Sequence, residues 1–257
     1  MRGSLRIGAC QTPEIVGDVD GALSCLEDFA VQAVERDVDL LLFPEGFLQG
    51  YLVEEPHLRE HALALDSDGF AAVLRRLTPV TPTLVFGVIE RGRGGYFNSA
   101  VVVERGRSRG VYRKTHLVPG EALFEAGEAY PTFVARDVRF GVNICYDSRF
   151  AEAAAPVAAQ GARLLLVPAQ NMMRREVAPY WKDRHHAIRA ERVRETGMWL
   201  ASADVTGERG DTHVGWGPTS VIAPDGEVVA RVALGTVGMA VAEVGERSGA
   251  SRLSRRP

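Results

Sequence analysis

Three side chains of complementary chemistry each lie at or near the end of a segment that is expected to form a strand. Glu45 follows residues 39–43, Lys114 ends residues 107–114, and Cys145 follows residues 138–144. A thiol can act as a nucleophile, a carboxylate can accept and return its proton, and an ammonium group can stabilise an oxyanion. Together these groups suit covalent catalysis in which the thiol forms a thioester.

Cys145 lies where an alternating apolar segment meets an Ala-rich stretch that is typical of a helix. We expect the free N–H groups and the dipole of that helix to lower the pKa of the thiol. A lone cysteine in an intracellular protein is more often a buried structural residue. This segment alone therefore leaves a structural and a functional interpretation open.

Three motifs carry a resemblance to a known family. Phe43-Pro44-Glu45 comes first, Tyr112-Arg113-Lys114-Thr115-His116-Leu117 second, and Ile144-Cys145-Tyr146-Asp147 third. Each motif is short, but their order and spacing together resemble the nitrilase superfamily of carbon–nitrogen hydrolases. The resemblance covers nearly the whole chain.

The resemblance implies a role for each residue. Cys145 is the expected nucleophile, and Glu45 the base that takes the thiol proton and returns it to the leaving amine. Lys114 is expected to stabilise the oxyanion, with the backbone N–H of Tyr146 as a second donor. The superfamily often has a second glutamate after the lysine, and the spacing favours Glu121 over Glu125.

Substrate contacts are harder to predict from the residues. We expect Tyr51, Tyr146 and Asn171 to contact the substrate. Loop residues that could line the same pocket are Met172, Met173, His213 and Trp216. No cofactor and no metal are expected, because the chain has no HExxH motif and no Cys/His spacing typical of zinc sites.

The residues after the cysteine indicate a branch of the superfamily. True nitrilases usually carry Trp-Glu there, whereas Tyr146-Asp147 is similar to amidases and carbamoylases. We therefore expect a thiol amidohydrolase that cleaves a small amide or N-carbamoyl compound and releases ammonia or an amine. A nitrilase, a thioester-based acyltransferase and a catalytically silent binding or scaffold protein remain alternatives.

Length and composition support a single domain over residues 1–257, with a flexible tail at 250–257, and the resemblance implies that it is a carbon–nitrogen hydrolase domain. The chain is 46% hydrophobic and 25% charged, and its net charge of −3 makes no case for nucleic acid or an anionic membrane. No apolar run approaches the roughly 20 residues that span a bilayer, and the N-terminus lacks a signal-peptide core. With three cysteines and no disulfide framework, we expect a cytoplasmic protein.

Hydrophobic periodicity predicts a mixed order of elements. Strands are expected at 5–10, 39–43, 83–89, 96–103, 107–114, 138–144, 163–167, 198–203, 219–223, 227–232 and 238–244. Helices are expected at 20–38, 67–77, 148–160 and 179–196. This order predicts an α/β fold with mixed sheets. The resemblance implies a four-layer α-β-β-α sandwich and a homodimer or higher homo-oligomer.

Overall fold

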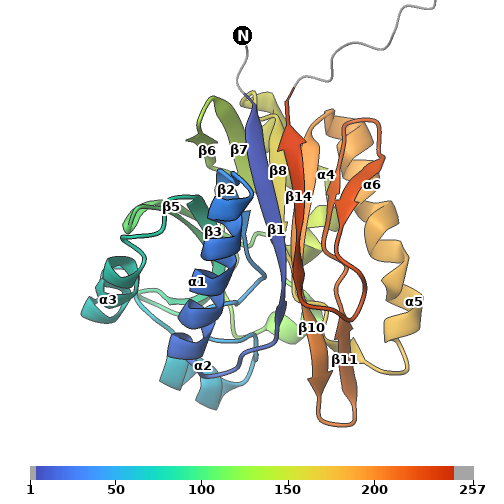
Figure 1. Cartoon of the computed structure of the whole chain (residues 1–257). Helices are drawn as coiled ribbons and strands as arrows, with labels where there is room; N and C mark the ends of the chain where they lie inside the picture. The colour runs from blue at the N-terminus through green and yellow to red at the C-terminus, as the bar shows by residue number, and fades with distance from the viewer. Residues whose placement is uncertain (1–3, 246–257) are drawn as a thin grey trace, which may run out of the picture.

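The computed structural model describes residues 4–245, so the predicted tail at 250–257 lies outside the described residues (Figure 1). The strands are β1 (Leu5–Pro13), β2 (Leu40–Leu42), β3 (Thr83–Arg91), β4 (Tyr96–Glu104), β5 (Arg107–Arg113), β6 (Thr132–Ala135), β7 (Val138–Val142), β8 (Leu164–Pro168), β9 (Met173–Arg174), β10 (Trp199–Arg209), β11 (His213–Trp216), β12 (Ser220–Ile222), β13 (Val228–Arg231) and β14 (Gly238–Val244). The α-helices are α1 (Val19–Glu35), α2 (Glu55–His61), α3 (Asp68–Arg76), α4 (Ala151–Ala159), α5 (Ala178–Lys182) and α6 (Arg184–Thr196). Two 3₁₀ turns are η1 (Pro119–Glu121) and η2 (Cys145–Arg149).

Local sequence accounts for the ends of several helices. Ser67 caps the start of α3, where its hydroxyl accepts a hydrogen bond from the N–H of Phe70 at 3.2 Å. Gly197 ends α6 with a left-handed φ of 68°, a conformation that glycine adopts at little cost. The single helix predicted at 179–196 is wrong, because the chain breaks at Asp183 into α5 and α6.

Strand β10 joins the two halves of the sheet. Trp199 to Ala203 pair in parallel with β8, and Asp204 to Thr206 pair in parallel with β1. One half runs β5-β4-β3-β2-β1 with β14 added beside β1, and the other runs β6-β7-β8-β10 with β12 and β13 added. The predicted strand at 198–203 is too short, because β10 continues to Arg209 and turns into β11, which was not expected.

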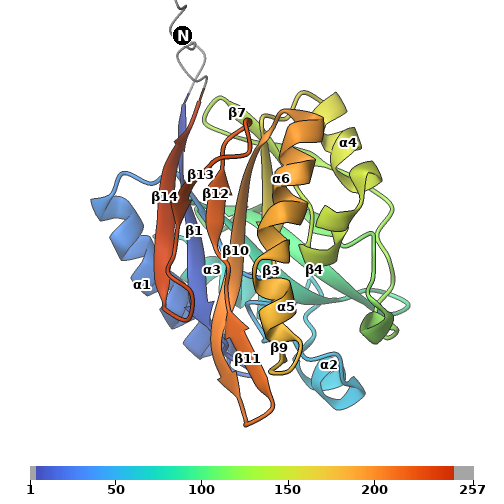
Figure 2. The same ribbon diagram turned by 90° about the vertical axis from the view of Figure 1, so that its right-hand side faces the viewer.

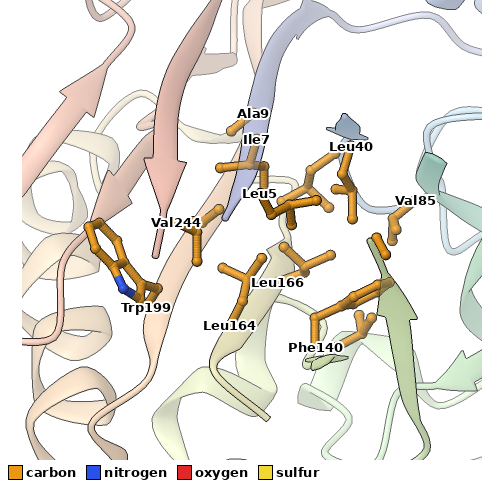
Figure 3. Close-up of a cluster of buried hydrophobic side chains, with 14 of the residues drawn as sticks. Leu5, Ile7, Ala9, Leu40, Val85, Phe140, Leu164, Leu166, Trp199 and Val244 are labelled. Carbon is orange, nitrogen blue, oxygen red and sulfur yellow. The ribbon is translucent and has the colours of Figure 1, made fainter. Parts of the chain in front are cut away.

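The two halves pack face to face, and helices cover their outer surfaces. A core of side chains from both halves lies between the sheets, including Leu5 and Leu40 on one side and Phe140 and Leu166 on the other (Figure 3). Residues of α1 and α3 pack on the outer face of the first half, and residues of α4 and α6 on that of the second (Figures 1 and 2). This packing orders the fold as helices, sheet, sheet and helices, and the predicted α/β class is confirmed.

Strand directions bring the three motifs to one edge. Strands β2 and β3 are parallel, and β5 returns to that direction after the antiparallel β4. In the other half, β7 and β8 are parallel. Glu45, Lys114 and Cys145 follow β2, β5 and β7, so each lies beyond the carboxyl end of its strand.

Candidate active site

A buried lysine lies between two buried carboxylates. Lys114 Nζ donates to Glu45 Oε1 at 2.8 Å and to Glu121 Oε1 at 2.9 Å. Asn98 Nδ2 donates to the same two oxygens, at 2.7 Å and 2.8 Å. All four side chains are almost completely excluded from solvent. The structure thus brings Glu121 into the cluster and leaves Glu125, the alternative second glutamate, exposed.

The other carboxylate oxygens are held by backbone groups. Glu45 Oε2 accepts the N–H of Gln170 at 3.1 Å, and Glu121 Oε2 accepts the N–H of Val118 at 2.8 Å. Tyr51 Oη donates to Glu121 Oε1 at 2.6 Å. Because each carboxylate has several fixed donors, neither can rotate away without losing hydrogen bonds inside a buried site.

Burial and charge shift the pKa values of this cluster in different directions. Burial raises the pKa of Glu45, with Glu121 adding to the effect and Lys114 opposing it. Burial lowers the pKa of Lys114, but the charges of Glu45, Cys145 and Glu121 outweigh it, so the net pKa lies above its ordinary value. Lys114 is therefore a permanent cation, and the raised pKa suits Glu45 to proton transfer.

Cys145 begins η2 with its backbone in the left-handed region, at a φ of 44°. A non-glycine residue in this region carries strain of order 1–3 kcal/mol, and such strain concentrates at functional sites. The expectation of a lowered thiol pKa is wrong. Burial raises the pKa of Cys145 and Glu45 raises it further, while Lys114 only partly opposes them. The helix that was expected to begin beside the cysteine does not do so, because a 3₁₀ turn follows Cys145 and α4 begins only at Ala151.

Asp147 ties the cysteine turn to the strand that carries the lysine. Its Oδ2 accepts the N–H of Ile144 at 2.8 Å and the hydroxyl of Tyr112 at 2.7 Å. Its Oδ1 accepts the N–H of His116 at 2.8 Å and that of Thr115 at 3.2 Å. One fully buried carboxylate thereby fixes the residue before Cys145 relative to the residue after Lys114.

The Asp147→Asn variant should be less stable and less active. The amide of asparagine has one acceptor oxygen, whereas the carboxylate of Asp147 has two. The NH₂ group of the amide must therefore face donors that the second carboxylate oxygen satisfied. Each buried donor left without an acceptor costs about 1–3 kcal/mol of stability. Urea unfolding measures the loss, and Asp211→Asn, at an exposed position in the β10–β11 turn, is the matched control. Equal stability of the two variants would contradict the role of Asp147.

The cluster opens into a cavity of about 320 Å³. Glu45, Lys114, Cys145 and Gln170 form part of its wall. Aromatic and apolar residues form another part, namely Tyr51, Val118, Tyr146, Met172, Met173, Trp181 and Ile188. The predicted contacts Tyr51, Tyr146 and Asn171 thus all line the cavity. His213 and Trp216, on β11, do not.

Sequence reasoning missed several polar residues of this cavity. Arg149 lies at the wall with its guanidinium 5.2 Å from the ring centre of Tyr146 and 5.5 Å from that of Trp181. His185 faces the same space, where burial lowers its pKa to about 3, aided by the charge of Arg189, so its ring is neutral. No local sequence pattern identifies these residues, because Arg149 lies in the turn η2, and His185 and Arg189 lie on the polar helix α6.

A second buried pair supports the wall beside Cys145. Arg189 Nη1 donates to the carbonyl of Pro218 at 2.7 Å, and Nη2 lies 3.6 Å from Asp204 Oδ2. Asp204 accepts the backbone N–H of Asn171 at 2.9 Å and also its side-chain amide. Asn171 is therefore held by Asp204 as well as lining the cavity.

Within residues 4–245, no group of His, Cys, Asp and Glu side chains is arranged to hold a metal ion.

Comparisons with known proteins agree with this geometry. The profile of the carbon-nitrogen hydrolase family matches residues 6–252. A protein of Pseudomonas protegens described as a hydrolase in the pqqF 5′ region is 32% identical over 236 residues, which cover 90% of this chain and 80% of that protein. An (R)-stereoselective amidase of a Pseudomonas species is 31% identical over 201 residues, 78% of this chain and 71% of the amidase.

Solved structures show the same fold. An amidase from Nesterenkonia sp. AN1 superposes with a TM-score of 0.81 at 25% identity, over 94% of this chain and 93% of its own. A variant of that amidase carries acrylamide added to its active-site cysteine. The resemblance found in the motifs is confirmed. With the match extending over nearly its whole length, the chain belongs to the carbon–nitrogen hydrolase family, in the amidase branch of the nitrilase superfamily.

Proposed function

We propose that this protein is a thiol amidohydrolase that cleaves a small amide or N-carbamoyl compound through a thioester on Cys145. The observation that carries the proposal is the bridge of Lys114 between Glu45 and Glu121, on the wall of the cavity that Cys145 also lines. The amidases among its relatives support the reaction class.

Acylation needs a base because the resting thiol is protonated. Glu45 takes the proton as Sγ attacks the carbonyl carbon, and the carbonyl oxygen becomes an oxyanion. Lys114 Nζ and the backbone N–H of Tyr146 stabilise this charge. The C–N bond then breaks as Glu45 gives its proton to the leaving nitrogen, which departs as ammonia or an amine and leaves the thioester.

Deacylation repeats the same transfers with water. Glu45 takes a proton from water, whose oxygen attacks the thioester carbon, and Lys114 again stabilises the oxyanion. The C–S bond breaks, the proton returns to Sγ, and a carboxylic or carbamic acid leaves. Glu121 contacts no reacting atom in this scheme: it holds Lys114 in place and is itself held by Asn98 and Tyr51.

The cavity suits a substrate that combines an apolar part with an anionic group. Arg149 has no carboxylate partner among the residues that the structure describes, although its guanidinium lies close to two aromatic rings. A substrate carboxylate would supply the missing charge. This favours N-carbamoyl amino acids and amides of dicarboxylic acids over neutral aliphatic amides.

The Arg149→Met variant should lose this preference. We expect KM for an anionic amide to rise about tenfold, the effect of losing roughly 1.4 kcal/mol of binding. KM for a neutral amide of the same length should change less than twofold. The two substrates serve as controls for each other in steady-state assays of ammonia release. Equal changes for both would exclude a carboxylate contact.

The test of the proposed function is ammonia release from a panel of small amides, N-carbamoyl amino acids and amines, and nitriles. The parent and Cys145→Ala are compared on each compound. Release by the parent alone supports the proposal, and the best substrate identifies its type. Release from nitriles only would favour a nitrilase, and release that persists in Cys145→Ala would refute the thiol mechanism.

A homo-oligomer is part of the proposal. Exposed apolar side chains on and beside α5 (Val177 and Tyr180) and around β13 and β14 (Val229, Leu234 and Val237) support self-association. Light scattering after size exclusion would measure the assembly.

No helix within residues 4–245 is long and apolar enough to cross a membrane. The cytoplasmic location and the single domain over 1–257 stay predictions.

A further inference from the structure

An ion pair lies just outside the cavity and has no part in the reaction as proposed. Glu14 follows β1, and Arg209 ends β10. Arg209 Nε donates to Glu14 Oε2 at 2.8 Å, and its Nη2 donates to Glu14 Oε1. The side chain of Glu14 is 9% exposed and that of Arg209 is 33% exposed. This bidentate geometry gives the pair a defined orientation.

Each member of the pair also contacts a loop that enters the active site. Glu14 Oε1 accepts a hydrogen bond from Gln170 Nε2 at 2.5 Å. Arg209 Nη2 donates to the backbone carbonyl of Tyr51 at 3.3 Å. Glu14 therefore holds the segment after β8, and Arg209 holds the segment after β2.

Both contacted residues hold the catalytic carboxylates directly. The N–H of Gln170 donates to Glu45 Oε2 at 3.1 Å. The backbone of Gln170 also interacts with Cys145 and lowers the pKa of its thiol, which burial raises. The hydroxyl of Tyr51 donates to Glu121 Oε1 at 2.6 Å. One ion pair is thus a single hydrogen-bonded residue away from each carboxylate that flanks Lys114.

The backbone around the pair leaves little room for movement. A Cβ atom on Gly50 would lie 2.5 Å from the carbonyl oxygen of Ile15 and 2.5 Å from the Cα of Val16. The N–H of Gly17 donates to the carbonyl of Gln49 at 2.8 Å. The segment that carries Glu14 and the one that carries Tyr51 are therefore packed together, so a displacement of Glu14 reaches the active-site loops.

We propose that Glu14 and Arg209 act as positioning residues, which set the geometry of Glu45 and Glu121 through Gln170 and Tyr51. The effect on turnover rests on the proposed amidohydrolase function. A shift of about 1 Å in reacting groups can cost roughly 10²-fold in rate, so loss of the pair should lower kcat while leaving substrate binding nearly unchanged. Neither residue lines the cavity that Cys145 lines.

The experiment compares Glu14→Gln, Arg209→Gln and Arg209→Lys with the parent. The matched control is Glu27→Gln, because Glu27 forms a similar bidentate pair with Arg76, at 2.8 Å for both bonds, between α1 and α3. Three quantities are measured for each protein: kcat and KM for ammonia release, the rate of Cys145 alkylation by iodoacetamide against pH, and Tm.

In Glu14→Gln and Arg209→Gln we expect kcat to fall about 10- to 100-fold with KM within twofold, and alkylation of Cys145 to need a higher pH. Arg209→Lys should recover part of kcat because its ammonium keeps the ion pair. Glu27→Gln should alter only Tm. Parent-like kcat and alkylation in Glu14→Gln, or equal losses of kcat in Glu27→Gln, would overturn the proposal.

Alkylation separates this inference from the function it rests on. If the parent releases no ammonia from any compound, the proposed function fails, but the pH dependence of Cys145 alkylation still reports the geometry around the thiol. A shift in Glu14→Gln that is absent in Glu27→Gln then supports positioning by the pair, and parent-like alkylation refutes it.

Discussion

Replacement of Lys114 by methionine is expected to lower kcat for ammonia release by about 10²–10³-fold, the range for removal of one oxyanion donor. It should also destabilise the fold, by about 3–5 kcal/mol if both carboxylates stay charged, because a buried ion pair loses one partner. Lys114 is 1% exposed and bridges Glu45 and Glu121. Methionine fills a similar volume but leaves these two carboxylates facing each other without a cation.

The pKa of the Cys145 thiol gives a second test of the Lys114→Met variant that does not depend on turnover. The charge of Lys114 lowers the pKa of Cys145, so its removal raises that pKa further. Alkylation of Cys145 in Lys114→Met should therefore require a higher pH than in the parent.

The other lysine of the chain gives a matched control. Lys182 lies on α5, with Nζ 5.6 Å from the ring centre of Trp216, away from both carboxylates. Lys182→Met should keep kcat and the pH dependence of alkylation. Denaturant unfolding of both variants shows under which conditions each remains folded. Activity is then assayed under those conditions, so that a loss of kcat is not a loss of folded protein. Parent-like turnover in Lys114→Met would refute the mechanism.

Replacement of Glu45 by glutamine is expected to lower kcat by about 10²–10⁴-fold, the usual contribution of general acid–base catalysis. Glutamine keeps the size of the side chain and an oxygen that accepts from Lys114 and Asn98. It cannot take a proton from the thiol or return one to the leaving amine. Fold stability should fall far less than in Lys114→Met.

The Cys145 thiol should respond in the opposite direction to that in Lys114→Met. The negative charge of Glu45 raises the pKa of Cys145, second only to burial, while Lys114 lowers it. Removal of the carboxylate takes away this upward contribution, while burial, Asp204 and Lys114 keep their effects, so the pKa of the thiol falls. Alkylation of Cys145 in Glu45→Gln should reach its half-maximal rate at a lower pH than in the parent.

Peptide mapping by mass spectrometry can follow this shift at each cysteine. Cys25 is an internal reference, because burial raises its pKa to about 11 and it lies on α1, outside the cavity. Its alkylation should be the same in the parent and both variants. A shift to higher pH at Cys145 in Glu45→Gln would contradict the placement of the Glu45 charge beside the sulfur.

Much of the fold was predictable from local sequence. The hydrophobic pattern predicted the strands that lead to Glu45, Lys114 and Cys145, and also the strands at 83–89 and 96–103, which pair as the antiparallel strands β3 and β4. Short or polar elements were missed, including α2 and β6, because about two turns of helix or four residues of edge strand have too little periodicity. The break between α5 and α6 leaves no proline or glycine signal at Asp183.

The residues of the candidate site that belong to a sequence motif could be predicted. Glu45, Lys114 and Cys145 each stand in a recognisable triplet or longer run, and spacing alone favoured Glu121. Asn98 carries no such signal, because one asparagine in an alternating strand is compatible with either face. Its contact with both carboxylates follows from the pairing of β4 with β3 and β5.

The sequence by itself determined the chemistry available to this protein: a thiol, a base and a cation, each at the end of a strand. The tertiary structure decided how close these groups lie and how their pKa values shift. The thiol pKa is raised rather than lowered, because the sulfur is enclosed beside a carboxylate that lies a hundred positions earlier, from Glu45 to Cys145. Burial and long-range charge are properties of packed segments, so no local pattern could reveal them.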